Sequence, residues 1–230
     1  LAGLKITQTH IRKAINKTKI NTANPTKWSE EEIITFLQSL REIAKPMIYA
    51  ANKIDIENAR ENYDRLKVKY TDDLIPCSAL AEFFLRKYSE DQVISYTPGD
   101  GDFQILKKDK LSSKDLATLE KLRENILQKH GSTGIQDLIN KAVFDILDVI
   151  AVYPVEDQNK YTDHKGNVLP DVYLVPKGTT AREFAGMIHQ DLAKSFINAI
   201  LIKSQRRIGE DYELQDGDII KINAAEGLKT

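Results

Sequence analysis

The chain has few of the residues from which many metal and disulfide sites are built. A single cysteine among 230 residues excludes a disulfide framework and a zinc site made from cysteines. No signal peptide and no long apolar run occur, so we expect a cytoplasmic protein without membrane contact. The histidines are scattered without the spacing of metal ligands, at His10, His130, His164 and His189. We therefore expect no metal site within this chain.

An excess of one charge is also absent. The chain has 33 lysines and arginines against 34 aspartates and glutamates, so its overall field favours neither nucleic acid nor an acidic substrate. Any basic surface must therefore be local. The hydrophobic content of 41% is that of a globular protein, and 230 residues are enough for two domains with modest cores.

An apolar stretch that ends in a polar cluster is the most informative part of the sequence. Residues 45–55 read Lys-Pro-Met-Ile-Tyr-Ala-Ala-Asn-Lys-Ile-Asp, which is typical of a central parallel strand whose carboxyl end holds a ligand. The Asp55 carboxylate can accept from both N1–H and the N2 amine of guanine, whereas adenine offers an acceptor at N1 and no amine at C2. Asn52 would donate to the purine N7, and the stem of Lys53 would cover the ring. The alternative is an Asx turn in which Asn and Asp only bind backbone amides.

A second apolar stretch ends in a similar way. Residues 74–77, Leu-Ile-Pro-Cys, predict a short strand that stops at Ser78, Ala79 and Leu80, where a helix begins. The first N–H groups of a helix have no partner within it, so they are well placed to receive a carbonyl oxygen such as guanine O6. The two stretches in this order predict a two-point binding site for a guanine base.

Capping boxes and turn residues divide the rest of the chain into elements. The boxes predict helix starts at Ser29 with Glu32, Ser112 with Asp115, Thr133 with Gln136, and Thr180 with Glu183. The first of these helices has an apolar face that includes Ile33 and Leu37, and the third is expected to run to Ile150. A hairpin is predicted from 93–96 and 103–106, and strands at 171–176, 199–202 and 218–222 surround one helix, as in a β-grasp module.

These motifs and their order resemble a known family. Asn52, Lys53 and Asp55 are similar to the fourth G motif of P-loop GTPases, and Ser78-Ala79-Leu80 is similar to the fifth. Residues 177–185, 188–192 and 206–214 resemble a TGS domain. Half a G domain followed by a TGS domain resembles the Obg-related YchF subfamily of GTPases. The sequence is most similar to the archaeal branch, whose pattern matches residues 24–28, 45–55, 131–134 and 152–155.

The resemblance implies an α/β fold, in which the C-terminal part of a P-loop GTPase, with a doubly wound and mainly parallel sheet, precedes a β-grasp (ubiquitin-like) TGS domain. It implies that residues 1–27 end a helical insertion, that 28–150 form the C-terminal half of the G domain, and that 151–226 form the TGS domain. It also implies a monomer that binds GTP, acts in translation, and contacts the ribosome or RNA through its TGS domain. The basic residues that could contact phosphates are Lys177, Lys203, Arg206 and Arg207, unless they form only a solvated basic loop.

The residues with which this family holds phosphates do not occur in the chain. A P-loop GTPase needs G-x-x-x-x-G-K-[ST], a Ser or Thr hydroxyl on Mg²⁺ and an Asp from a second strand. The 230 residues contain no such motif, and Lys177-Gly178-Thr179-Thr180 has similar residues in the wrong order. We therefore expect the Mg²⁺ ligands and the catalytic groups in an amino-terminal half that this chain lacks. The chain alone is then inactive and binds GTP weakly, and only the intact protein hydrolyses GTP.

Two functions from different classes remain open at this point. The preferred one is a translation-associated GTP hydrolase. Many relatives carry Asn-x-x-Glu at the fourth motif and use ATP, whereas this chain keeps Asp55, which favours GTP over ATP. The alternative is a non-enzymatic module, in which a degenerate G domain is a scaffold and the TGS domain binds RNA or a protein.

Overall fold

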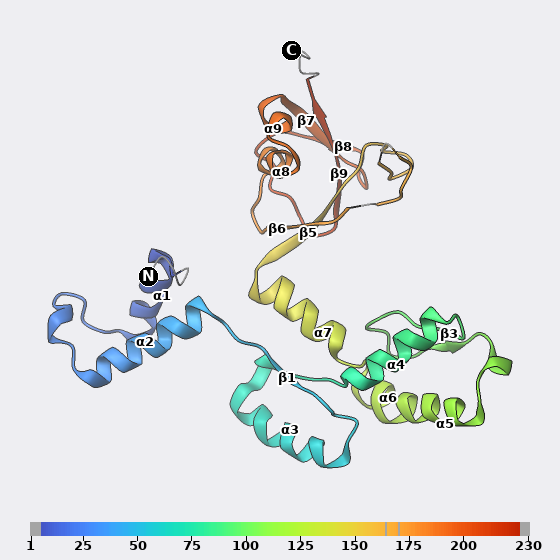
Figure 1. Ribbon diagram of the computed structural model, residues 1–230. Coiled ribbons are helices and arrows are strands. Elements are labelled where there is room, and N and C mark those ends of the chain that lie inside the picture. The colour runs from blue at the N-terminus through green and yellow to red at the C-terminus, as the bar shows by residue number, and fades with distance from the viewer. Residues whose placement is uncertain (1–5, 164, 170, 226–230) are drawn as a thin grey trace. The chain divides into compact units, whose positions relative to one another are not determined.

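The structure, a computed structural model, describes residues 6–163, 165–169 and 171–225. The chain divides into two compact units, Leu1–Ile139 and Asn140–Thr230 (Figure 1). The domain limits 1–27, 28–150 and 151–226 stay a prediction. Residues 1–5, 164, 170 and 226 of those ranges lie outside the described residues, and this includes His164.

Two helices open the first unit. The predicted capping box is confirmed, because the Ser29 hydroxyl accepts from the Glu32 N–H and the Glu32 carboxylate accepts from the Ser29 N–H. The expected apolar face is only partly buried, since Ile33 is 40% and Leu37 is 53% exposed, while Leu40 is 4% exposed. The helices pack against each other and are joined by a Lys17–Glu42 ion pair of 2.8 Å. They are α1 (Gln8–Thr18) and α2 (Glu30–Ala44).

Two short strands carry the predicted base-binding motifs. β1 (Tyr49–Ala51) and β2 (Leu74–Pro76) pair in parallel, with Tyr49 opposite Leu74. Pro46 lies between α2 and β1, where it prevents the helix from continuing into the strand. The crossover from β1 to β2 contains the charged helix α3 (Glu57–Tyr70). Within the described part of this unit, the parallel sheet consists of this pair.

A hairpin and further helices complete the first unit. The predicted hairpin is confirmed by antiparallel pairing of β3 (Ile94–Ser95) with β4 (Gln104–Ile105). The helices are α4 (Ala79–Glu90), α5 (Ser113–Leu122), α6 (Gln128–His130) and α7 (Ile135–Asn140), with a π-helical segment at Arg123–Leu127. Their buried core comprises Leu85, Val93, Ile94, Tyr96, Phe103, Leu111, Leu119 and Leu127.

The helix predicted from Thr133 to Ile150 is wrong at both ends. α7 begins at Ile135, because the Thr133 hydroxyl donates to the Glu82 carboxylate instead of capping the helix. After a π-helical segment (Lys141–Ile146), the chain enters strand β5 (Val149–Pro154). The apolar run is continuous from helix to strand, so periodicity alone did not reveal the change; the β-branched Val149 and Ile150 pair in a sheet.

The second unit is a β-grasp fold with one five-stranded mixed sheet. Its order is β6-β5-β9-β7-β8, in which β5 and β9 are parallel and the other pairs are antiparallel. Helices α8 (Ala181–Ile188) and α9 (Gln190–Lys194) lie on one face of this sheet (Figure 1). Three strands agree with the prediction, β6 (Tyr173–Pro176), β7 (Phe196–Leu201) and β9 (Asp218–Ala224), whereas β5 and β8 (Arg206–Ile208) were not expected.

The core of the second unit is centred on Phe184 of α8. This side chain is 0% exposed, and its ring meets the Tyr173 ring edge-on at a centroid distance of 5.5 Å. It packs with buried aliphatic residues of the sheet, among them Val152, Val175 and Ile220. The predicted capping box of Thr180 and Glu183 is confirmed and starts α8 at the residue that brings Phe184 over the sheet.

We expect Phe184→Ala to destabilise the second unit by about 3–5 kcal/mol, because it removes a fully buried aromatic ring and leaves a cavity. Native-state hydrogen exchange of the β9 amides measures this loss. Phe144→Ala is the matched control, since Phe144 belongs to the same unit but is 37% exposed. Equal effects of the two substitutions would contradict this description of the core.

Candidate functional site

The carboxyl ends of β1 and β2 bring the two predicted motifs together. The Cys77 N–H donates to the Ala51 carbonyl at 3.0 Å, and the Ile54 N–H donates to the Cys77 carbonyl at 3.2 Å. The parallel pairing therefore continues beyond the last strand residues and holds the two following loops side by side. This is the position at which open α/β sheets bind ligands.

The Asn52 side chain connects the two loops. Its Oδ1 atom accepts from the Lys53 N–H at 2.8 Å and from the Ala79 N–H, across the site, at 3.1 Å. Its Nδ2 atom has no partner among the described residues. Asn52 thus binds backbone amides, as an Asx turn would, and it keeps its two amide hydrogens for another molecule.

A hydroxyl group orients the Asp55 carboxylate. Buried Ser78 donates from Oγ to Asp55 Oδ1 at 2.6 Å, and the same Oγ accepts from the Ala81 N–H at 3.2 Å as the N-cap of α4. Asp55 is exposed, and its Oδ2 atom has no partner in the described part of the chain. The carboxylate is therefore fixed in position while most of its acceptor capacity remains available.

The expectation that the N–H groups at the start of α4 are free is wrong for Ala79 and Ala81. Their amides donate to Asn52 Oδ1 and Ser78 Oγ, because both side chains act as caps for the helix end. The Leu80 N–H has no partner within the described residues. It is the donor that this helix start offers to a carbonyl oxygen, and Ala79 can serve only by exchanging its partner.

Lys53 adopts a backbone conformation that the sequence did not indicate. Its φ angle is 69°, in the left-handed region, which costs a residue with a side chain about 1 kcal/mol or more. The Lys53 N–H donates to Asn52 Oδ1, and its carbonyl accepts from the Ile56 N–H at 3.0 Å. These bonds hold the turn that redirects the chain after β1, and the Lys53 side chain is exposed beside it.

The segment Gly131–Gly134 contacts the second loop, which follows β2. The Thr133 carbonyl accepts from the Ser78 N–H at 2.9 Å. Gly134 has a φ angle of +77°, and a Cβ atom there would lie 1.9 Å from the Pro76 carbonyl oxygen. Sequence reasoning identified this segment only as a family pattern, although its two glycines were a signal of close backbone approach.

The groups around the site differ in ionisation. Burial raises the pKa of the Cys77 thiol at the end of β2, so this cysteine stays protonated at neutral pH. A polar hollow of about 520 Å³ borders Asp55, and His130 lines it together with Arg60 and Lys129. Burial lowers the pKa of His130, and the two cations lower it further, so this imidazole is neutral at pH 7.

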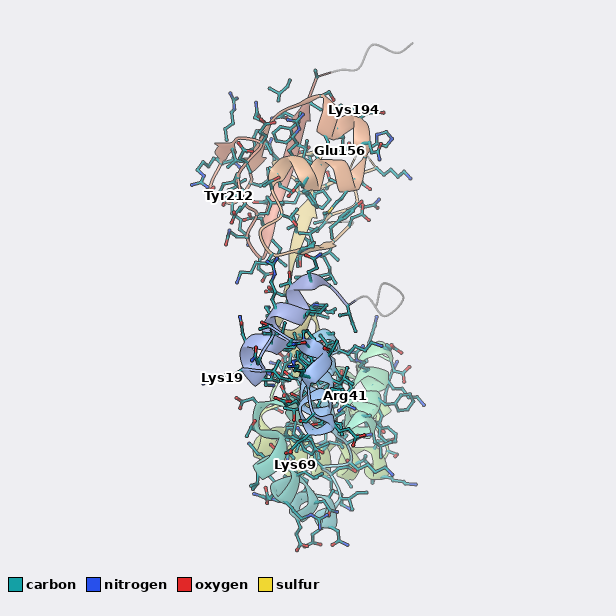
Figure 2. All side chains as sticks on the ribbon, turned by 90° about the vertical axis from the view of Figure 1, so that its left-hand side faces the viewer. Lys19, Arg41, Lys69, Glu156, Lys194 and Tyr212 are labelled. Carbon is teal, nitrogen blue, oxygen red and sulfur yellow. The ribbon has the colours of Figure 1, made fainter. Side chains whose placement is uncertain are left out.

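The basic residues of the second unit do not form one patch. Arg206 and Arg207 lie in strand β8 rather than in the expected loop, and Lys203 is in the turn that precedes this strand. Lys177 follows β6, and three strands separate β6 from β8 in the sheet. The Arg206 guanidinium lies 5.0 Å from the ring centroid of Tyr212, which is labelled in Figure 2.

The described ranges contain no helix that is both long and apolar enough to cross a membrane. They also contain no group of three or more His, Cys, Asp or Glu residues arranged to hold a metal ion.

Comparison with known families identifies two regions of the chain. Residues 50–157 match the Obg-like GTPase YGR210-like, G4 motif-containing domain. Residues 159–224 match the TGS domain. The first region includes both loops of the candidate site, and the second includes the sheet that carries Arg206 and Arg207.

Relatives with both regions are found among known proteins. A GTP-binding protein of Methanocaldococcus jannaschii is 43% identical over 226 residues, which cover 98% of this chain and 56% of the relative. The Ribosome-binding ATPase YchF of Buchnera aphidicola is 25% identical over 237 residues, which cover 91% of this chain and 53% of the relative. A crystal structure of a GTP-binding protein from Pyrococcus horikoshii OT3 has 37% identity and a TM-score of 0.66, covering 97% of this chain and 58% of that one. The chain thus spans little more than half the length of these proteins.

We expect Gly134→Ala to destabilise the first unit by about 2–4 kcal/mol, because the added methyl group meets the Pro76 carbonyl and the residue has a positive φ angle. Urea denaturation measures the change. Gly131→Ala is the matched control, since its φ is +81° but a Cβ atom there has nothing within 4 Å. Its cost is expected to be the conformational part alone, about 1–2 kcal/mol. A smaller loss for Gly134→Ala than for Gly131→Ala would contradict the close contact.

Proposed function

We propose that this chain, which belongs to the Obg-like, YchF-related family of GTP-binding proteins, selects guanine nucleotides for a GTP hydrolase that acts in translation. It joins a G4 motif-containing domain to a TGS domain. The observation that carries this proposal is the set of groups that converge where β1 and β2 end. Asn52 Nδ2, the Asp55 carboxylate and the Leu80 N–H are all available there, and the hydrogen bond between Ser78 and Asp55 fixes their relative positions.

The available groups match the edge of guanine. Asp55 accepts from N1–H and from the N2 amine, the Leu80 N–H donates to O6, and Asn52 Nδ2 donates to N7. The stem of Lys53 covers one face of the ring. Adenine places an acceptor opposite Asp55, has no amine at C2, and places an amine opposite the Leu80 N–H, so three polar contacts are lost. Each unpaired group costs about 1–3 kcal/mol, which is sufficient for strong discrimination.

Hydrolysis needs residues beyond this base-reading site. The sequence has no G-x-x-x-x-G-K-[ST] motif, and the described residues hold no cluster suited to Mg²⁺. We therefore assign no catalytic residue here, and we expect weak nucleotide binding by the chain alone because the phosphates supply much of the affinity. The alternative is a non-enzymatic module, in which a degenerate G domain is a scaffold and the TGS domain binds RNA or a protein.

The TGS domain is proposed to contact ribosomal RNA in the cytoplasm. The YchF relative is named as ribosome-binding, and Arg206 and Arg207 are exposed on an edge strand. Arginine side chains of this kind neutralise phosphates and release counterions. A simpler role is also consistent with their place, since charged residues on a short edge strand prevent pairing with another sheet.

We expect the chain to bind guanosine monophosphate in preference to adenosine monophosphate, and Asp55→Asn to reverse the preference toward xanthosine monophosphate. Xanthine has a carbonyl in place of the C2 amine, so an asparagine amide can donate where the carboxylate accepted. Nuclear magnetic resonance titrations at millimolar nucleotide measure the three affinities, and Asn52 Nδ2–H₂ and Leu80 N–H report the contact.

Asp64→Asn is the control for this experiment. Asp64 is an exposed carboxylate on α3 and lies away from both loops in sequence. The Asp64→Asn substitution removes the same charge as Asp55→Asn and should leave the preference for guanine unchanged. An Asp55→Asn chain with the nucleotide preference of the unaltered chain would disprove the assignment of guanine to this site.

We expect the double substitution of Arg206 and Arg207 by alanine to weaken ribosome association and to make it less dependent on salt. Each lost phosphate contact should reduce the slope of log K against log salt by about 1. Co-sedimentation with ribosomes over a range of salt concentrations measures the slope. Lys194→Ala, at an exposed position on α9 (Figure 2), is the control and should leave the slope unchanged. An unchanged slope after the double substitution would exclude the proposed RNA contact.

A further inference from the structure

Glu82 of α4 is a buried carboxylate that is not among the groups proposed to contact the base. It lies one helical turn after Ser78 and is 5% exposed. Its Oε1 atom accepts from Arg86 Nε at 2.6 Å. Its Oε2 atom accepts from two hydroxyls, that of Tyr96 at 2.8 Å and that of Thr133 at 2.6 Å. A charged group is seldom buried unless its partners are held in place as well.

The carboxylate is ionised in this environment. Burial alone would raise the pKa of Glu82, but hydrogen bonds from Thr133, Arg86 and Tyr96 outweigh it and lower that pKa. Burial, followed by the hydrogen bond to Glu82, raises the pKa of Tyr96 to about 12. At neutral pH both hydroxyls therefore donate to a charged oxygen, and such bonds are shorter and stronger than those between neutral groups.

A continuous series of hydrogen bonds leads from Glu82 to the base-reading site. The Thr133 hydroxyl donates to Glu82, and the Thr133 carbonyl accepts from the Ser78 N–H at 2.9 Å. Ser78 Oγ then donates to Asp55 Oδ1 at 2.6 Å. Each of these three links joins residues that are distant in sequence.

The neighbours of Thr133 leave it little freedom. The Ser132 hydroxyl accepts from the Gly134 N–H at 2.9 Å and donates to Asp137 Oδ2 at 2.6 Å. Gly134 fits against the Pro76 carbonyl too closely for any side chain. The Thr133 side chain is thus held by Glu82, and its backbone is held by the turn at Ser132 and Gly134. Thr133 is 1% exposed.

We propose that Glu82 and Thr133 are positioning residues for base recognition. The charged carboxylate orients Thr133, the Thr133 carbonyl fixes the Ser78 backbone, and Ser78 sets the plane of the Asp55 carboxylate. Reading N1–H and the N2 amine together requires that plane to match the plane of the base. This inference rests on the proposed function, because it concerns how the same site distinguishes guanine from adenine.

A purely structural role for Glu82 is the competing explanation. Glu82 also joins α4 to Tyr96, which follows β3, so its removal would destabilise the unit in either case. Only the positioning role predicts a change in base discrimination. Tyr96 provides the means to separate the two, because its hydroxyl donates to the same Oε2 atom as Thr133 but makes no hydrogen bond with Ser78 or Asp55.

The experiment compares Thr133→Val, Thr133→Ser and Tyr96→Phe with the unaltered chain. For each, magnetic resonance titrations give the ratio of the dissociation constants for adenosine and guanosine monophosphate, and urea denaturation gives the stability. Thr133→Val should reduce the ratio about threefold to tenfold, as expected for the loss of one hydrogen bond. Thr133→Ser keeps the hydroxyl and should restore the ratio. Tyr96→Phe should lower stability and leave the ratio unchanged.

Hydrogen exchange of the Ser78 amide provides a second measurement that needs no nucleotide. The exchange should be faster in Thr133→Val and in Glu82→Gln, because the second substitution removes the charge and one of the two acceptor oxygens, while amides of α5 keep their protection. A ratio that is unchanged in Thr133→Val, or that falls equally in Tyr96→Phe, would overturn the inference. If the unaltered chain itself does not distinguish the two nucleotides, the proposed function fails, and the inference fails with it.

Discussion

The hydrogen bond between Ser78 Oγ and Asp55 Oδ1 is the interaction on which the arrangement of the site depends. It connects two loops that are 23 residues apart, and it is possible only because β1 and β2 pair in parallel register. Asn52 adds the reciprocal link, from the first loop to the start of α4. The site is therefore organised before any ligand arrives, which reduces the entropy that binding must overcome.

This preorganisation has a cost, which is visible in the backbone. Lys53 takes a left-handed conformation, and Gly134 meets the Pro76 carbonyl at a distance that excludes a side chain. Local hydrogen bonds hold both turns: the Lys53 N–H donates to Asn52 Oδ1, and the Gly134 N–H donates to Ser132 Oγ. Strain of this kind persists where the surrounding structure determines the conformation, and it is commonly found at functional sites.

Sequence was sufficient to bring Asn52, Asp55 and Ser78 to one place, because polar residues that follow adjacent parallel strands meet at one edge of the sheet. Capping boxes likewise located several helix starts, since a side chain and an amide three residues later interact locally. Other features depend on distant partners and were not predictable. The Ala79 amide is used by Asn52, and the role of Glu82 needs Thr133, which lies 51 residues away. Lys177 proved remote from Arg206 because strand order decides which edge a residue joins.

The ends of β1 and β2 are proposed to recognise guanine through its hydrogen-bonding edge. A crystal structure of this chain, soaked with guanosine monophosphate at high concentration, would locate the base. We expect both Asp55 oxygens within hydrogen-bonding distance of N1 and N2, the Leu80 or Ala79 amide at O6, and Asn52 Nδ2 at N7. A base bound elsewhere, or bound at this position without contact to Asp55, would contradict it.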